Sequence, residues 1–488
     1  MKKYGFQALM ILVLLDLAFV LMAAVNPKVK LWGNEEHSVN FHFFSLQNMF
    51  SSDTTLVSNL KIDLLADNLI TNDTLKIYKL KNNALLDSAF LALPNDTLKD
   101  TSFNCIINPN HDGVLALDNF FKALIDERNL KLIRIAHYGD SQLEGDRITS
   151  EIRKNIQAKF GGSGTGYIPI DDLASCASYS RENSDGWIRY NVFNNKFKKH
   201  NSYGISGNTF RFSSEEDESG NTHSATVSYA LSKGVSYQKM TLLYGRAPNG
   251  FTVKCFNTSN NSLLCTMSIP ATESTGLTTL KLTSIPSNFR LEFTSSNGPD
   301  LYGIQLDSYT GITIDNYAIR GHSGDGLLLI NQNFLSKQLR ETNTRLIIFE
   351  FGNNMVPYLK SEKQCEKYED LFYKLFKKFK EAAPEASVLV IGNGDMGYRA
   401  GGVAQSYKYV RGLNTVLKNA ALKSNSAFWN LLDNMGGDNS IVIWNKKGLA
   451  TLDGHLTPKG QKIMSNLIFK AIMVEYNSFV LRNFYTKK

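Results

Sequence analysis

Four short stretches, far apart along the chain, carry residue types that together could catalyse acyl transfer. They are GDSQ at 139–142, AIRGHSG at 318–324, EFGNNM at 350–355 and LDGHLTPKG at 452–460. Acyl transfer needs a nucleophile, a base that takes its proton, and hydrogen-bond donors for the oxyanion. Ser141 can serve as the nucleophile and His455 as the base. The backbone amides of Ser141 and Gly321 and the side-chain amide of Asn354 can serve as the donors.

Each stretch alone also has an ordinary interpretation. A Gly-Asp-Ser sequence is more often a turn than a nucleophile, a single histidine is more often a surface residue, and GNN can simply end a strand. Their shared placement favours a site, because each lies at or near the carboxyl end of a predicted parallel strand. Open α/β sheets bind their ligands at that end.

The elements that must position these stretches are strand-like and helix-like runs in alternation. Strands are predicted at 131–138, 311–321, 344–352, 386–394 and 426–432, and helices at 114–126, 146–162, 327–339, 367–383 and 408–422. Such alternation predicts an α/β fold, a parallel sheet with helices on both faces. Residues 176–310 break the rhythm with short alternating segments rich in Ser, Thr, Asn and Gly, which predicts an inserted β-sandwich.

Aromatic residues of this insert are candidates for stacking on sugar rings, although core packing is the ordinary role of any one of them. They are Trp187, Tyr190, Tyr203 and Tyr244. Cys255 and Cys265 flank a turn-rich segment, so they either form a disulfide across a hairpin or remain two unlinked strand cysteines. The five cysteines show no CxxC spacing and do not cluster with histidine, so we expect no metal and no cofactor.

The first 25 residues are predicted to be an uncleaved membrane anchor. Lys2 and Lys3 precede an apolar run interrupted only by Gln7 and Asp16, and no clean cleavage site follows, although a cleaved signal peptide or a buried helix is an alternative. The lysines place the rest of the chain outside the cytoplasmic membrane as a single-pass protein. Residues 26–112 are polar and have no assigned role. The net charge of +8 is spread along the chain, which argues against nucleic-acid binding.

With residues 176–310 set aside, the order and spacing of the four stretches resemble the signature blocks of the SGNH/GDSL hydrolase superfamily. The resemblance covers roughly residues 115–170 and 312–475. It implies a flavodoxin-like sheet, the SGNH hydrolase fold, divided here into parts at 113–175 and 311–488. It also implies that Ser141 is the nucleophile, that His455 is the base, and that the oxyanion hole consists of Ser141, Gly321 and Asn354.

The sequence departs from the family pattern at two places. Met355 stands where an acidic residue usually follows the third-block asparagine, and Leu452 stands where the triad acid usually precedes the histidine. We expect Asp453 to orient His455 instead, since residues two apart in an extended segment project to one side. The alternative is a Ser-His dyad oriented by a backbone carbonyl, with Asp453 capping the helix that begins near Pro458.

Four further residues lie close to the blocks. His137 and His322 are predicted first to pack or to line the pocket, with substrate contact as the less favoured role, and Tyr138 and Met355 are predicted to be walls of the site. If any of the four binds substrate, we expect His322 and Met355 to do so. The contexts around the first and last blocks look most like envelope-bound bacterial members thought to act on acylated polysaccharide. Acetyl esterases of this family also carry a β-sandwich resembling a carbohydrate-binding module at the position of the insert.

The resemblance implies a serine esterase that removes acetyl or other small acyl groups from an envelope polysaccharide or peptidoglycan. An alternative is an O-acetyltransferase that receives acyl groups from a membrane-bound O-acyltransferase partner and passes them to a glycan. A less favoured alternative is a non-catalytic glycan-binding protein, against which the complete set of Ser, Gly, Asn and His argues.

Overall fold

The computed structural model describes residues 28–33, 38–42, 105–193, 201–214 and 220–484. The chain divides into two compact units, residues 1–64 and 65–488. In the first unit, β1 (Lys28–Gly33) and β2 (Ser38–His42) form an antiparallel hairpin. The predicted anchor at residues 1–25 lies outside the described residues. Within the described ranges, no helix is both long enough and apolar enough to cross a membrane.

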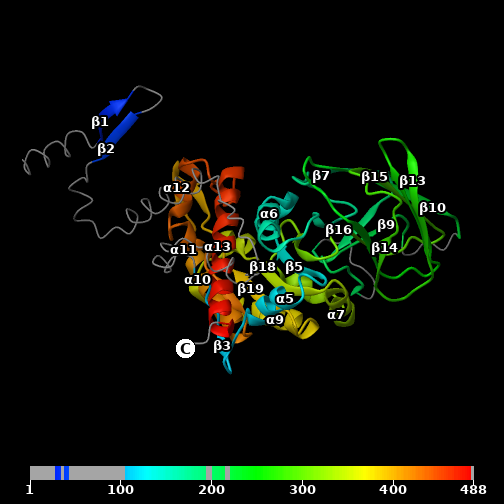
Figure 1. The fold of residues 1–488 in the computed structure, drawn as a ribbon. Helices are drawn as coiled ribbons and strands as arrows, with labels where there is room; N and C mark the ends of the chain where they lie inside the picture. The colour runs from blue at the N-terminus through cyan, green and yellow to red at the C-terminus, as the bar shows by residue number, and fades with distance from the viewer. Residues whose placement is uncertain (1–27, 34–37, 43–104, 194–200, 215–219, 485–488) are drawn as a thin grey trace, which may run out of the picture. The chain divides into compact units, whose positions relative to one another are not determined.

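A parallel sheet of five strands forms the centre of the α/β part (Figure 1). The strands are β5 (Leu132–Gly139), β17 (Gly311–Ala318), β18 (Thr344–Glu350), β19 (Ser387–Ile391) and β22 (Ala427–Trp429). Their spatial order is β17-β5-β18-β19-β22. In chain order this is 2-1-3-4-5, the flavodoxin-like arrangement, whose switch point lies between β5 and β18. The predicted parallel sheet is therefore confirmed.

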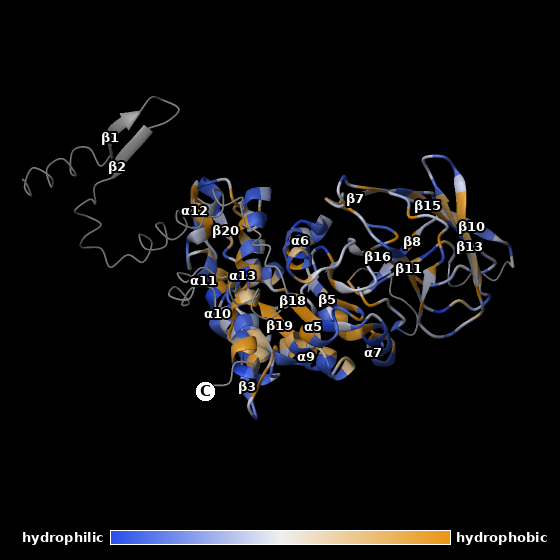
Figure 2. Ribbon diagram, viewed as in Figure 1, coloured by the Kyte–Doolittle hydropathy of each residue, from blue (hydrophilic) through white to orange (hydrophobic). Residues whose placement is uncertain are grey.

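Helices in two groups cover the sheet, and the strands between them are mostly apolar (Figure 2). One group is α5 (Asp118–Asp126), α6 (Thr149–Phe160) and α13 (Pro458–Phe484), and the other is α7 (Gln332–Glu341), α9 (Glu369–Ala382) and α10 (Val410–Lys423). In α9 the buried residues Phe372, Leu375, Phe376 and Phe379 follow helical spacing and form the inner stripe.

Short elements complete this part of the chain. They are β3 (Asn110–His111), β4 (Val114–Leu115), η2 (Glu144–Asp146), η4 (Asp325–Leu329), η5 (Asn353–Tyr358), α8 (Glu362–Glu366), β20 (Gly397–Ala400), β21 (Val403–Ser406), α11 (Leu431–Met435) and α12 (Ser440–Lys446). Ile107 exchanges two backbone hydrogen bonds with Phe428 on β22. This pairing covers the outer edge of β22.

Residues 166–307 form two antiparallel sheets that share one apolar core. The first, in the order β13-β12-β15-β10-β7, contains β7 (Tyr179–Asn183), β10 (His223–Leu231), β12 (Phe251–Asn257), β13 (Ser262–Ile269) and β15 (Asn288–Ser295). The second, in the order β14-β11-β16-β9-β8, contains β8 (Ile188–Asn191), β9 (Asn208–Arg211), β11 (Lys239–Tyr244), β14 (Gly276–Leu280) and β16 (Leu301–Asp307), and β6 (Gly166–Ile168) pairs with β16. Every second side chain of β15 is buried, as a sandwich requires. The insert thus begins before the predicted boundary at residue 176.

The aromatic residues of the insert that were candidates for sugar stacking pack against the apolar cores of the protein. Trp187 and Tyr244 pack against the sandwich core, Tyr190 packs against the core of the α/β part, and Tyr203 is fully buried. Cys255 and Cys265 lie directly opposite each other across β12 and β13, and both are free thiols.

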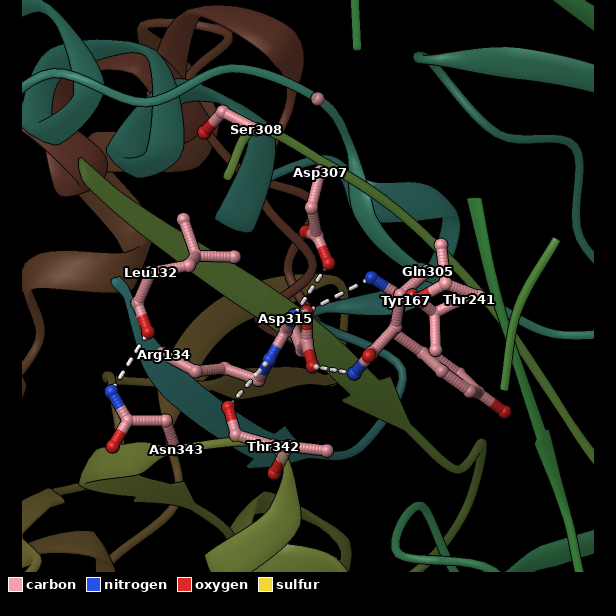
Figure 3. A network of polar contacts seen from close by, with 12 residues as sticks. Leu132, Arg134, Tyr167, Thr241, Gln305, Asp307, Ser308, Asp315, Thr342 and Asn343 are labelled. Carbon is pink, nitrogen blue, oxygen red and sulfur yellow. Dashed lines mark hydrogen bonds and ion pairs between the residues drawn. The ribbon is translucent and has the colours of Figure 1, made fainter. Parts of the chain in front are cut away.

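A buried polar network joins the insert to the parallel sheet (Figure 3). Arg134 on β5 donates from Nη1 to Asp315 Oδ1 and from Nη2 to Asp307 Oδ2, each at 2.6 Å. Asp315 Oδ1 also accepts the backbone N–H of Tyr167 on β6 at 2.9 Å. The three charged groups lie on β5, β16 and β17, so this network holds the sandwich against the strand that leads to Ser141.

Candidate active site

The ends of three neighbouring strands bring the first three sequence stretches together. Gly139 at the end of β5 pairs in register with Ala318 of β17 on one side and Glu350 of β18 on the other. The three strands therefore end side by side, and Ser141, Gly321 and Asn354 follow within two to four residues of these ends. Because the first and third stretches follow β5 and β18, they lie on either side of the topological switch point.

The turn after β5 presents Ser141. A Cβ on Gly139 would lie 2.6 Å from Leu143 Cδ1 and 3.0 Å from the Glu350 carbonyl oxygen, so only glycine fits there without movement. Asp140 is buried and its Oδ1 accepts the backbone N–H of Gln142 at 3.0 Å, which closes the turn. Ser141 itself is only partly buried.

His455 and Asp453 complete a chain of hydrogen-bonding groups that begins at Ser141. Ser141 Oγ lies 2.9 Å from His455 Nε2, and His455 Nδ1 lies 3.1 Å from Asp453 Oδ2. The side chains of His455 and Asp453 are 43% and 66% exposed, so this acid faces water. Partial burial alone would raise the pKa of Asp453, but a hydrogen bond from Thr451 and the charge of His455 outweigh it and lower the pKa.

The segment between Asp453 and His455 is a tight turn and not the extended segment that was expected. Gly454 has φ +93°, a left-handed conformation that suits glycine, and it bends the chain between Asp453 and His455. Thr451 Oγ1 donates to Asp453 Oδ1 at 2.5 Å and steadies the carboxylate. The cap of α13 is Thr457, whose Oγ1 accepts the N–H of Gly460 at 3.4 Å, so Asp453 does not cap that helix.

Gln142, the residue after Ser141, contacts the loop that carries His455 and was not predicted as part of the site. Its Nε2 donates to the Gly454 carbonyl at 2.6 Å, and its Oε1 accepts the Leu456 N–H at 3.4 Å. Both contacts flank His455. The Gln142 side chain, which no sequence pattern marks, therefore connects the loop of His455 to the turn of Ser141.

The two further oxyanion candidates lie in different surroundings. Gly321 has φ +73°, and a Cβ there would lie 3.2 Å from the ring of Phe193. Asn354 Nδ2 lies 2.9 Å from Asp140 Oδ2 and 3.1 Å from the His322 carbonyl oxygen. These two acceptors engage the Asn354 amide group. To donate to an oxyanion, the amide must share one of its two hydrogens between the oxyanion and the present acceptor. Phe193, which is 51% exposed, comes from the insert and was not predicted.

The predicted wall residues are mostly packing residues here. His322 is fully buried between the rings of Phe193 and Phe351, and burial lowers its pKa to about 4. Met355 is 7% exposed and belongs to the apolar core of the α/β part. Tyr138 lies in the same core and donates to the Ile205 carbonyl at 2.9 Å. Direct substrate contact by His322 or Met355 stays a prediction.

Buried carboxyl groups lie close to the turn that carries Ser141. Burial, with a smaller contribution from the charge of Glu350, raises the pKa of Asp140 to about 7, although the hydrogen bond from the Gln142 backbone opposes the rise. Glu350 Oε2 lies 3.2 Å from the Nε2 of His137, which is fully buried. Within the described part of the chain, Glu350 Oε1 and Asn353 Oδ1 are buried without a hydrogen-bond partner, and both residues line a small cavity with Gln142.

Comparison with solved structures places this arrangement in a known fold. A peptidoglycan O-acetylesterase matches with a TM-score of 0.58 at 18% identity, over 76% of this chain and 99% of that chain. This chain has an SGNH/GDSL esterase-like fold. An acetyl xylan esterase matches 33% of this chain at TM-score 0.26 and 14% identity and covers 80% of its own length. A family two carbohydrate esterase from Clostridium thermocellum matches 52% of this chain at TM-score 0.24 and 11% identity and covers 92% of its own length.

These last two scores are too low to align a site. No protein-family model and no curated protein matches the sequence. The fold likeness and the geometry at Ser141 are thus the two observations on which a functional assignment rests.

Proposed function

We propose that this protein is a serine esterase that removes acetyl or another small acyl group from a cell-envelope polysaccharide. The observation that carries the proposal is the relay from Ser141 through His455 to Asp453, with both contacts within hydrogen-bond distance. Its place at the carboxyl edge of the sheet, on a fold shared with a peptidoglycan O-acetylesterase, supports the reaction class.

The reaction begins with proton transfer from Ser141 Oγ to His455 Nε2 as the oxygen attacks the ester carbonyl. Asp453 orients the ring and balances the charge that His455 gains. The oxyanion accepts hydrogen bonds from the amides of Ser141 and Gly321 and from Asn354. His455 then gives its proton to the departing sugar oxygen. In the second half of the reaction, His455 takes a proton from water as the water attacks the acyl carbon, and it returns that proton to Ser141 Oγ as the acyl–oxygen bond breaks and the free acid leaves.

Mass spectrometry tests this proposal directly. After brief incubation with 4-nitrophenyl acetate, we expect an acetyl group on Ser141 that disappears with time, and no label in Ser141→Ala. Asn354→Ala should lower turnover on the order of a hundredfold, because it removes one donor. An unlabelled native chain that also releases no nitrophenol would contradict the assignment.

The same experiment identifies the acceptor. Repeating it with an oligosaccharide present shows whether a sugar hydroxyl or water removes the acetyl group. Transfer to sugar would make the protein an O-acetyltransferase, served by a membrane-bound O-acyltransferase that supplies the acyl group. Hydrolysis alone supports the esterase.

We further propose that residues 1–25 anchor the protein in the cytoplasmic membrane, with the site on the outer side. The two lysines before the apolar run support this orientation. Protease added to spheroplasts should then degrade the chain, and protection of the whole chain would reverse the orientation. A site outside the membrane would meet polysaccharide, the substrate class proposed here.

A further inference from the structure

Arg320 lies beside the proposed oxyanion residue Gly321 and forms a bidentate ion pair. Its Nε donates to Glu144 Oε1 at 2.7 Å and its Nη2 donates to Glu144 Oε2 at 2.6 Å. The Glu144 side chain is 6% exposed, whereas that of Arg320 is 58% exposed. Glu144 follows the nucleophile by three residues, so the ion pair joins the nucleophile turn to the second sequence stretch.

The pair leaves part of the guanidinium available. Nε and Nη2 form one edge of the planar group, and Glu144 occupies that edge on its buried side. The Nη1 end, with two N–H groups, points away from this carboxylate. Arg320 is therefore a cation whose orientation is fixed before any ligand binds, which lowers the entropy lost on binding.

Glu144 does not neutralise its surroundings, because it also contacts a second arginine. Arg147 Nη2 lies 3.4 Å from Glu144 Oε2, and the Arg147 side chain is 38% exposed. A second carboxylate, Asp172, lies 3.4 Å from the guanidinium of Arg189. Glu144 is therefore shared by the guanidinium groups of Arg320 and Arg147.

We propose that Arg320 binds a carboxylate of the glycan next to the acylated hydroxyl, so that the preferred substrate is an acidic glycan. This inference rests on the proposed esterase function and specifies its substrate. A guanidinium matches the planar geometry of a carboxylate and stays charged at every physiological pH. Arg320 is adjacent to Gly321 and its partner Glu144 follows Ser141 by three residues, so a carboxylate bound by Arg320 would lie on the same side of the sheet as the acyl group.

Steady-state kinetics on two probes tests the proposal, with acetylated polygalacturonate as the acidic glycan and acetylated xylo-oligosaccharide as the neutral one. The native protein should prefer the acidic probe. Arg320→Gln should reduce this preference by roughly tenfold to a hundredfold, mainly through KM, because a charged hydrogen bond is lost. Arg320→Lys should keep part of the preference, since it keeps the charge without the fixed geometry.

Arg482→Gln is the matched control, because Arg482 also forms a bidentate pair, with Asp118, and its side chain is 36% exposed. It lies near the far end of α13, about 36 Å along that helix from its start at Pro458. We expect no change in preference for this variant. An equal loss on both probes in Arg320→Gln would reduce Arg320 to a positioning residue and overturn the proposal, as would no preference in the native protein.

A binding measurement separates this proposal from the esterase assignment. In Ser141→Ala, which lacks the nucleophile, calorimetric titration should give a higher affinity for deacetylated oligogalacturonate than for xylo-oligosaccharide. Adding Arg320→Gln should remove that difference, while a thermal melt shows that the double variant is folded. Acidic binding that survives the substitution contradicts the role of Arg320. Absence of hydrolysis by the native protein, together with Arg320-dependent binding, would contradict the esterase assignment alone.

Discussion

Asp453→Asn should lower esterase turnover by roughly tenfold, far less than the loss expected of a buried triad acid. Two unit charges 4 Å apart attract by about 1 kcal/mol in water and about 4 kcal/mol at the effective dielectric of a protein surface. With the Asp453 carboxylate 66% exposed and His455 43% exposed, the lower part of this range applies, about 1 to 2 kcal/mol. Since 1.36 kcal/mol is tenfold in rate, the loss is about fivefold to thirtyfold.

The assay is hydrolysis of 4-nitrophenyl acetate at fixed pH in low salt and in about 1 M salt. High salt should bring the native rate closer to that of the variant, because the screening length falls to about 3 Å. Asp438→Asn is the matched control, since Asp438 is 60% exposed and pairs with Arg411. A loss on the order of 10⁴ would show that the acid acts as a buried group does, and an unchanged rate would show that a dyad suffices.

Four other expectations follow from the described contacts. Ser141→Ala should abolish turnover and leave the melting temperature almost unchanged, because its hydroxyl is not part of the core. Arg134→Met should lower the free energy of unfolding by about 3 to 5 kcal/mol in urea titrations, since it leaves two buried carboxylates without their cation. Gln142→Ala should reduce kcat more than KM, measured on the same ester, because it frees the loop that holds the base. Burial raises the pKa of Asp140 to about 7, so the folded chain holds a proton there between about pH 4 and 7 that the unfolded chain lacks. Stability should fall as pH rises through that window, and Asp140→Asn should remove the decline in urea titrations at about pH 4.5 and about pH 7.5.

The parallel sheet could be predicted because its strands are mostly apolar and each ends at, or within two residues of, a glycine or a polar residue. The run at 131–138 lies within one residue of β5, and the Phe and Leu spacing of α9 indicated its inner face. The start of the insert was missed because β6 is only three residues long and carries no alternation. Short strands gain their stability from a partner, here β16, which local sequence does not reveal.

The place of Ser141 at the end of β5 could be predicted, but His455 follows α12 and not a parallel strand, and the contacts that hold both residues could not be predicted. No local pattern marks contacts between residues that are far apart in the sequence. Examples are the contacts of Gln142 with Gly454, of Glu144 with Arg320 and of Phe193 with Gly321. Asp453 was predicted from the geometry of an extended segment, but the structure shows a turn there. A positive-φ glycine, and not strand alternation, turns its carboxylate toward His455.

The insert interrupts the chain between two parts of one site, yet it does not separate them. β5 and β17 pair in register along their whole lengths, so Gly139 and Ala318 meet although the sandwich lies between them in sequence. Closing a longer loop adds little entropy cost, which makes such an insertion tolerable. What it requires is a fixed junction, and the Arg134 network with the pairing of β6 and β16 supplies one. A sandwich held in this way can place Phe193 against Gly321, which makes the insert part of the site.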